Sequence, residues 1–132
     1  GPDFFEVIDF IDPNGDFVTD ASITKAKISP APFVVIPTLG EVIEYSYEYP
    51  ANSRVVIRIF DLAGRFVTTL RDDYLGSEGG TQGVAEKPIW DGRDHLGGIV
   101  APGTYIIHLE ASNFQTGKTT TDTAPIVVGV RF

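Results

Sequence analysis

Short segments of alternating polar and apolar residues are the feature that most constrains how this chain can fold. The clearest segment runs from Gly103 to Ala111, where every second side chain from Tyr105 onward is apolar or aromatic. A period of two is typical of a strand that buries one face. The segments Val42 to Tyr49 and Arg54 to Asp61 follow the same pattern, and no long segment shows the 3.6-residue period of an amphipathic helix.

Turn-forming residues separate these segments. They cluster at Pro37 to Gly40, Pro50 to Ser53, Leu62 to Arg65 and Ser112 to Gly117. The prolines in Ser29 to Phe33 and Pro125 are expected to interrupt regular structure, and the polar, glycine-rich stretch Arg71 to Gly83 is expected to form a loop. Seven or eight short strands with turns at this spacing predict an all-β, antiparallel sandwich.

The stretch from Trp90 to Tyr105 contains the only tryptophan and leads into the clearest strand. We predict that Trp90 is buried and that Pro102-Gly103 starts a central strand. Asp91 and Asp94 are expected to cap the tight turn between them. The predicted core comprises Ile57, Ile59, Leu70, Trp90, Tyr105, Ile107 and Leu109.

An apolar segment near the N-terminus predicts an extra strand or hairpin outside the main sandwich. Residues 1–27 are predicted to form this extension, followed by a sandwich domain of residues 28–132, and Asn14-Gly15 suits a hairpin turn. The candidate interaction residues are Phe4, Phe5, Val7, Ile8, Phe10 and Ile11. This strand could pair with its own sandwich or exchange into a neighbouring copy.

The net charge of −8 narrows the range of partners. Ten Lys and Arg side chains are dispersed among 18 Asp and Glu, whereas nucleic-acid binding needs clustered cations. Nucleic acids and anionic membrane surfaces are therefore not expected as partners. The sequence has no cysteine and no apolar run of the ~20 residues that span a bilayer. It does not begin with Met, so we expect a fragment or a matured product.

Two groups of polar residues are weak candidates for calcium. Asp12, Asn14 and Asp16 have the spacing of the first ligands of a calcium loop, but no glycine follows them and the distal Glu is missing. Asp91 and Asp94 could bind a cation together with loop carbonyls, but Asp in a tight turn more often caps backbone N–H groups. We therefore predict neither a metal nor a cofactor.

The residues that could support catalysis do not predict an enzyme. The two histidines are His95, in a turn, and His108, on the outer face of a strand, and no serine lies in a Gly-x-Ser-x-Gly elbow. Asp72, Asp73 and Glu78 are the carboxylates best placed for glycosidase chemistry. A solvated loop is the simpler explanation of these three residues.

A row of tyrosines raises the possibility of carbohydrate binding. Tyr45, Tyr47 and Tyr49 share one face of a predicted strand. An exposed row would form a platform on which sugar rings stack, whereas alternating aromatics on a strand more often pack in a core. The exposure of these side chains distinguishes the two readings.

Several stretches together resemble a known family. They are Val55 to Leu70, Trp90-Asp91-Gly92-Arg93-Asp94, Gly97, Val100, Pro102-Gly103-Thr104-Tyr105 and Ser29 to Phe33. In residue types and spacing, these stretches resemble the immunoglobulin-like domain named after the flagellar hook-capping protein (FlgD-Ig). The likeness spans roughly residues 28–131 and leaves out the N-terminal extension.

The resemblance implies an immunoglobulin/fibronectin-III-like sandwich in a bacterial secreted or surface protein. Domains of this family act in structural, sorting or assembly roles, and the family supplies no catalytic residue to carry over. We therefore expect a non-enzymatic, extracellular module that spaces, anchors or assembles a surface structure through protein partners, which are neighbouring domains or identical subunits. One such assembly is a fibre whose subunits exchange strands. The alternative is a carbohydrate-binding accessory module of a secreted enzyme.

Overall fold

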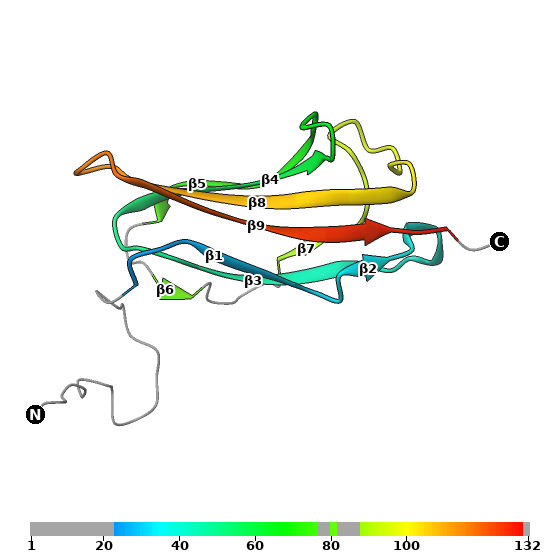
Figure 1. Cartoon of the computed structure of the whole chain (residues 1–132), viewed down its shortest axis with the longest axis horizontal. Coiled ribbons are helices and arrows are strands. Elements are labelled where there is room, and N and C mark those ends of the chain that lie inside the picture. The colour runs from blue at the N-terminus through cyan, green and yellow to red at the C-terminus, as the bar shows by residue number, and fades with distance from the viewer. Residues whose placement is uncertain (1–22, 77–79, 82–87, 131–132) are drawn as a thin grey trace, which may run out of the picture.

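The computed structural model describes residues 23–76, 80–81 and 88–130. These residues form two β-sheets that pack face to face (Figure 1). The predicted all-β sandwich is therefore confirmed, and the one helical turn in the described ranges is the 3-10 turn η2 (Pro37–Leu39). The predicted strand Phe4 to Ile11 and the calcium candidates Asp12, Asn14 and Asp16 lie outside the described residues.

The larger sheet has five strands in the order β2-β9-β8-β4-β5. Their bounds are β2 (Val34–Val35), β9 (Thr119–Val128), β8 (Gly103–Asn113), β4 (Ser53–Asp61) and β5 (Phe66–Gly76). β2 pairs with β9 in parallel, and the other neighbours are antiparallel. The central position of β8 agrees with its sequence, which has the clearest alternation in the chain.

The smaller sheet is built around β3 (Ile43–Tyr49), which pairs with three other strands. These are β1 (Lys27–Ala31), β6 (Gly80–Thr81) and β7 (Ile89–Trp90). β6 and β7 pair with opposite ends of β3, next to Tyr49 and Ile43 respectively. The described ranges thus contain nine strands, three of which are only two residues long.

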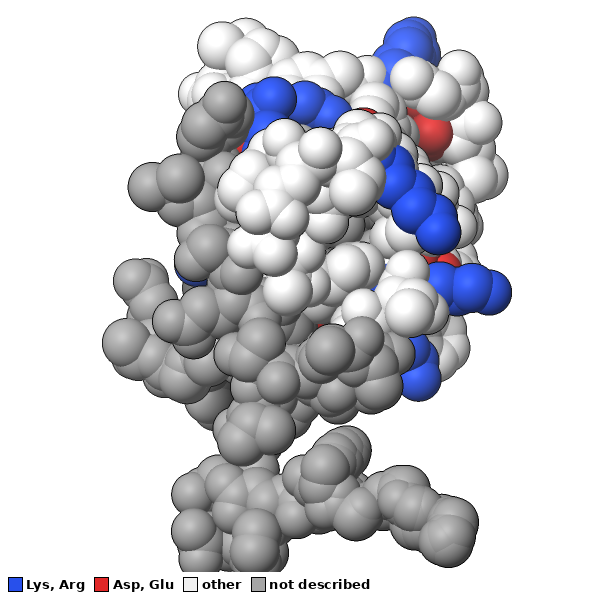
Figure 2. All heavy atoms as spheres, turned by 90° about the vertical axis from the view of Figure 1, so that its left-hand side faces the viewer, with Lys and Arg blue, Asp and Glu red and all other residues white. Residues whose placement is uncertain are grey.

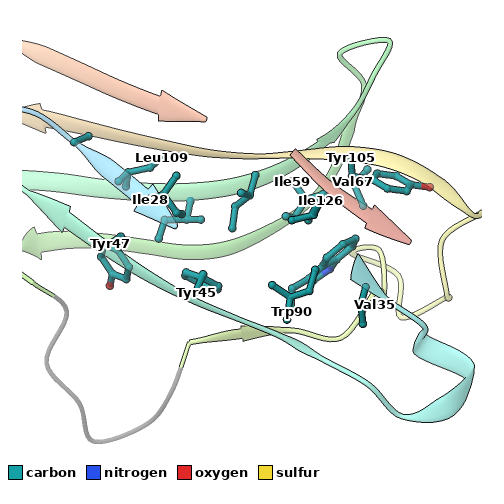
Figure 3. Packing of buried hydrophobic residues seen from close by; sticks show 14 of the residues in the cluster. Ile28, Val35, Tyr45, Tyr47, Ile59, Val67, Trp90, Tyr105, Leu109 and Ile126 are labelled. Atoms are coloured by element: carbon teal, nitrogen blue, oxygen red, sulfur yellow. The ribbon is translucent and has the colours of Figure 1, made fainter. Parts of the chain in front are cut away.

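The core lies between the two sheets and consists of the inward-facing residues of each strand (Figure 3). Burial of this apolar surface provides the main stabilisation of the sandwich. The predicted core residues that are buried are Ile57, Ile59, Trp90, Tyr105, Ile107 and Leu109. Leu70 is half-buried and packs against the margin of this cluster.

Proline did not interrupt the strands where the sequence led us to expect it. β1 continues through Pro30, and β9 continues through Pro125. Asn113 N–H donates to Lys118 O at 2.8 Å, so odd-numbered residues of β8 bond to β9 and the pair Ile106–Pro125 is not hydrogen-bonded. The absent N–H of Pro125 therefore points away from β8, where proline is tolerated.

The start of the predicted loop Arg71 to Gly83 is also strand, because β5 extends to Gly76. Its polar residues are compatible with a strand because they pair with β4 along the edge of the sheet. Asp72, for example, lies opposite Val56 and accepts two hydrogen bonds from the Arg54 guanidinium, at 3.0 and 2.7 Å. The prediction of a loop is therefore wrong for residues 71–76, because the polar side chains of this segment belong to an exposed edge strand.

Candidate functional site

The turn that follows Trp90 is held by its aspartates. Asp94 Oδ1 accepts hydrogen bonds from the N–H groups of Leu96 (2.9 Å) and Gly98 (3.0 Å). These bonds, and the bond from Gly98 most of all, hold the pKa of the Asp94 carboxyl below its usual value. Asp91 Oδ1 accepts a longer bond of 3.2 Å from Arg93 N–H. Both carboxylates therefore have the capping role that was predicted for them.

Trp90 connects this turn to the core. Its ring is 2% exposed and meets Tyr105 edge-on, with 5.9 Å between the ring centroids. Its Nε1–H donates to Arg93 O at 3.0 Å, which fixes the turn above it. The Tyr105 hydroxyl donates to Ala101 O at 2.6 Å at the other end of the same loop. The buried aromatic pair Trp90 and Tyr105 thus holds both ends of the loop between β7 and β8.

The tyrosine row does not form an exposed platform. Tyr45 is 5% exposed and Tyr47 is 3% exposed, and both belong to the core (Figure 3). Burial raises the pKa of Tyr45 to about 12, and it raises the pKa of Tyr47 further. Tyr49 is half-buried and stacks on Tyr47 with 5.9 Å between centroids. The argument for sugar stacking on this row has therefore lost its basis.

The two histidines lie at separate places near the outer face of the larger sheet. His108 meets the Phe60 ring edge-on at 5.9 Å. The His95 backbone N–H donates to Val67 O at 3.0 Å, and its ring Nδ1 lies 3.1 Å from the same oxygen. His95 lies in a turn, as predicted, and its side chain is exposed, while its two contacts with Val67 tie that turn to the start of β5.

The acidic candidates for glycosidase chemistry are only partly described. The Arg54 hydrogen bonds hold the pKa of the Asp72 carboxyl below its usual value, which favours the ionised form and opposes a general-acid role. Glu78 lies outside the described residues. Within residues 23–76, 80–81 and 88–130, no three His, Cys, Asp or Glu side chains are grouped closely enough to hold a metal ion.

One long side of the sandwich is closed by hydrogen bonds between its first and last described strands. Thr120 Oγ1 accepts from the N–H of Ala26, and Asp122 Oδ2 accepts from the N–H of Ile28, both at 2.8 Å. The next residue of the same parity is Pro30, which has no N–H to offer. The free edge of β1 therefore has no donor left for another strand at these three positions.

The opposite edge of the larger sheet is open in the described part of the chain. β5 is its terminal strand, eleven residues long, and it pairs only with β4. Asp61 N–H donates to Arg65 O at 2.9 Å, so odd-numbered residues of β4 bond to β5. Thr69 and Asp72 lie opposite the even-numbered residues 58 and 56, and their backbone groups therefore point away from β4.

A groove runs beside this open edge. It has a volume of about 380 Å³ and lies between Thr68 and Leu70 of β5 on one side and Ile89, Trp90 and the Asp-capped turn on the other. Three features therefore coincide along this side: a strand edge that pairs with no other described strand, a groove with a mixed apolar and polar lining, and the His95 contact that occupies the edge at Val67. The sequence analysis did not predict that the β1 side of the sandwich is closed and the β5 side is open. Pro30 and the two polar residues Thr120 and Asp122, which lie two positions apart, were signals of the closed β1 side.

Among the described residues, no helix has the length and apolar composition that crossing a membrane would need. No protein-family model matches the sequence, and no curated protein matches it. The family that the sequence resembles is therefore not established by these comparisons.

Two solved structures from Porphyromonas gingivalis are similar to this chain. One is the dimeric latent PorU, with a TM-score of 0.58 and 21% sequence identity over 80% of this chain. The other is PorZ, a surface component of the type-IX secretion system, with a TM-score of 0.42 and 17% identity over 77% of this chain. The chain corresponds to only 9% and 11% of the length of those proteins. At this level of identity, the likeness to PorU shows that the chain shares a β-sandwich fold with one part of that protein.

Proposed function

We propose that this chain is a non-enzymatic, extracellular structural module that assembles with neighbouring modules through the edge of β5. The observation that carries the proposal is the difference between the two sides of the sandwich. The β1 edge is blocked by Thr120, Asp122 and Pro30, whereas β5 presents outward-pointing backbone groups at Thr69 and Asp72. An open edge strand is a template for pairing with another chain, and proteins usually protect it when pairing is unwanted.

The resemblance to the FlgD-Ig family supports the same class of function. The residues that carry the resemblance have structural roles here: Trp90 is buried, Asp94 caps the turn, and Gly64 has the left-handed φ of 83° that its hairpin needs. Structural roles of this kind agree with the FlgD-Ig resemblance, from which the extracellular location is inferred, and they give no support to catalysis. A carbohydrate-binding module is the weaker proposal because its tyrosine platform is buried.

The partner in the simplest form of this assembly is a second copy of the chain. Two β5 edges can pair in antiparallel fashion about a two-fold axis, which joins two five-stranded sheets into one. The adjoining groove would then receive side chains from the facing strand, and Leu70, Ile89 and Trp90 supply its apolar wall. Backbone pairing supplies affinity in such contacts, and the groove supplies specificity.

A proline at Thr69 tests this proposal. The Thr69 side chain is exposed and its N–H points away from β4, so Thr69→Pro removes an outward donor without removing a bond to β4. Thr69→Ala keeps that N–H and serves as the matched control. We expect sedimentation equilibrium to show self-association of the full chain that is at least roughly tenfold weaker in Thr69→Pro and unchanged in Thr69→Ala. A wild-type chain that stays monomeric up to about 1 mM would contradict the proposal.

A further inference from the structure

A cavity lies at the end of the sandwich where the β3–β4 turn meets the β8–β9 turn. It has a volume of about 300 Å³ and shares no lining residue with the groove beside β5, so it is separate from the proposed assembly contact. Two hydrogen bonds join the turns: Phe114 N–H donates to Asn52 O at 3.1 Å, and Asn113 Nδ2 donates to Ala51 O at 3.3 Å. The walls of the cavity are therefore held in place by the fold itself.

Ser53 is the only buried residue in the lining of this cavity, since the other lining residues are half-buried or exposed. Its side chain is 1% exposed, and its hydroxyl oxygen has no hydrogen-bond partner. Serine has a single side-chain torsion with three staggered positions, so the hydroxyl can turn toward an acceptor in the cavity. A buried polar group without a partner is costly, and a ligand that supplies the partner removes that cost.

The other polar groups of the cavity also have hydrogens to donate. The hydroxyl oxygens of Thr116 and Thr120 accept from Lys118 N–H at 3.2 Å and from Ala26 N–H at 2.8 Å, and neither hydroxyl hydrogen has an acceptor among the described residues. The Lys118 ammonium forms no ion pair with a carboxylate in the described ranges. No Asp or Glu of the described chain lines the cavity. The site therefore offers donors and one positive charge, a combination that favours an anionic acceptor.

The remaining wall is apolar and is formed by Ile23, Pro50 and Ala51. Figure 2 faces this end of the sandwich, and among its described residues Lys and Arg are more visible than Asp and Glu. Donors on one side and an apolar wall on the other fit a molecule with a polar head and a small apolar body. The volume is at the lower end of the range of small-molecule sites, about 300–1,000 Å³.

We propose that this cavity binds a carboxylate on a short, branched apolar body. The carboxylate accepts a hydrogen bond from the Ser53 hydroxyl and pairs with the Lys118 ammonium, and the apolar body covers the wall formed by Ile23 and Pro50. Two kinds of molecule present this chemistry: a free aliphatic acid, and the C-terminal residue of a peptide.

Titration of the full-length, isotope-labelled chain with sodium isovalerate, followed by backbone amide chemical shifts, tests this proposal. Sodium chloride at the same concentrations corrects for ionic strength. We expect saturable shifts centred on the β3–β4 and β8–β9 turns, with a dissociation constant of about 1 mM or lower, which a ligand of about seven non-hydrogen atoms can reach. Isovaleramide has the same shape without the charge and should bind at least roughly tenfold more weakly.

Two variants with matched controls locate the site. Ser53→Ala removes the buried hydroxyl, Lys118→Met removes the charge, and each should weaken isovalerate binding about fivefold or more. Ser112→Ala and Lys27→Met make the same changes at residues that do not line the cavity, and both should bind like the wild type. Ser53→Ala should not lower the urea midpoint, because the hydroxyl that it removes has no partner in the free chain.

Three results would overturn the proposal: shifts that do not saturate up to about 50 mM isovalerate, equal binding of the acid and its amide, or unchanged binding in Ser53→Ala. A lower urea midpoint for Ser53→Ala would also contradict it, since the hydroxyl would then be bonded already. Acetyl-glycyl-valine distinguishes the two kinds of ligand, because tighter binding than isovalerate assigns the site to a peptide terminus and weaker binding assigns it to a free acid. Thr69→Pro should bind isovalerate like the wild type, so failure of the assembly proposal would leave this one standing.

Discussion

Replacement of Trp90 by alanine is the most direct test of the role assigned to the loop between β7 and β8. The indole is 2% exposed, packs on Tyr105 and donates one hydrogen bond to Arg93 O. We expect Trp90→Ala to weaken the sandwich before it changes any binding property. The reason is that the side chain is almost wholly buried in the core, and only its small exposed margin lines the groove beside β5.

The expected cost follows from these contacts. Removal of a buried aromatic side chain costs about 3–5 kcal/mol, and the Arg93 carbonyl left without its donor adds about 1 kcal/mol. Domains of this size are stable by roughly 5–15 kcal/mol, so the variant should lose a large fraction of its stability. Trp90→Phe keeps most of the packing and loses the N–H, and its cost should be about 1–2 kcal/mol.

Urea unfolding followed by far-ultraviolet circular dichroism measures these differences, because that signal comes mainly from the backbone and remains when the tryptophan is replaced. Ile89→Ala is the control, since its side chain precedes Trp90 in β7 and is 44% exposed. This control should change stability by less than about 1 kcal/mol. A Trp90→Ala variant whose free energy of unfolding lies within about 1 kcal/mol of the wild-type value would refute the interpretation that the buried Trp90 ring holds this loop to the core. A variant that stays stable but loses a partner would do the same.

Two further predictions concern the same scaffold. Gly92→Ala should cost several kcal/mol in urea unfolding, because Gly92 has a φ of 80° and an added Cβ would overlap the Pro37 ring; a neutral effect would contradict this packing. The free energy of unfolding should also fall at both pH extremes. Hydrogen bonds hold the pKa of Asp94 below 3.8, so its contribution is present above about pH 4 and is lost as the pH falls below it. Burial raises the pKa of Tyr45 to about 12, so stability should fall as the pH rises above about 10, where unfolded tyrosine ionises. Ultraviolet titration of the folded wild type and of Tyr45→Phe should give the same number of tyrosines ionising near pH 10, and a number smaller by one in the variant would show that Tyr45 is exposed.

Much of the fold was predictable from the sequence because alternation and turn chemistry are local signals. The alternating runs predicted β3, β4 and β8 to within two residues at each end, and the burial of Tyr105, Ile107 and Leu109 follows from their period of two. The turn at Asp94 was predictable for the same reason, since an Asx cap needs only residues that are close in sequence.

The features that the sequence did not predict depend on strand position. Whether proline interrupts a strand depends on which side its missing N–H faces, and the pairing of Pro125 with Ile106 is visible only in the assembled sheet. The cavity beside Ser53 could not be predicted either, because a lone serine at the start of a strand gives no sign of burial. Its place at the end of the core depends on two turns that are distant in the sequence.

The hydrogen bonds that fasten β1 to β9 also determine when the sandwich can be completed. Ala26 and Thr120 are separated by 94 positions, and so are Ile28 and Asp122. A chain that emerges from the ribosome or through a membrane pore with its N-terminus first cannot make these bonds until its last strand has appeared. Contacts of such long range slow folding, because most of the chain must be ordered before they form. We therefore expect closure of this side to be a late step in folding. Until that step, the partly emerged chain should lack a complete sandwich and should still be able to pass through a narrow pore.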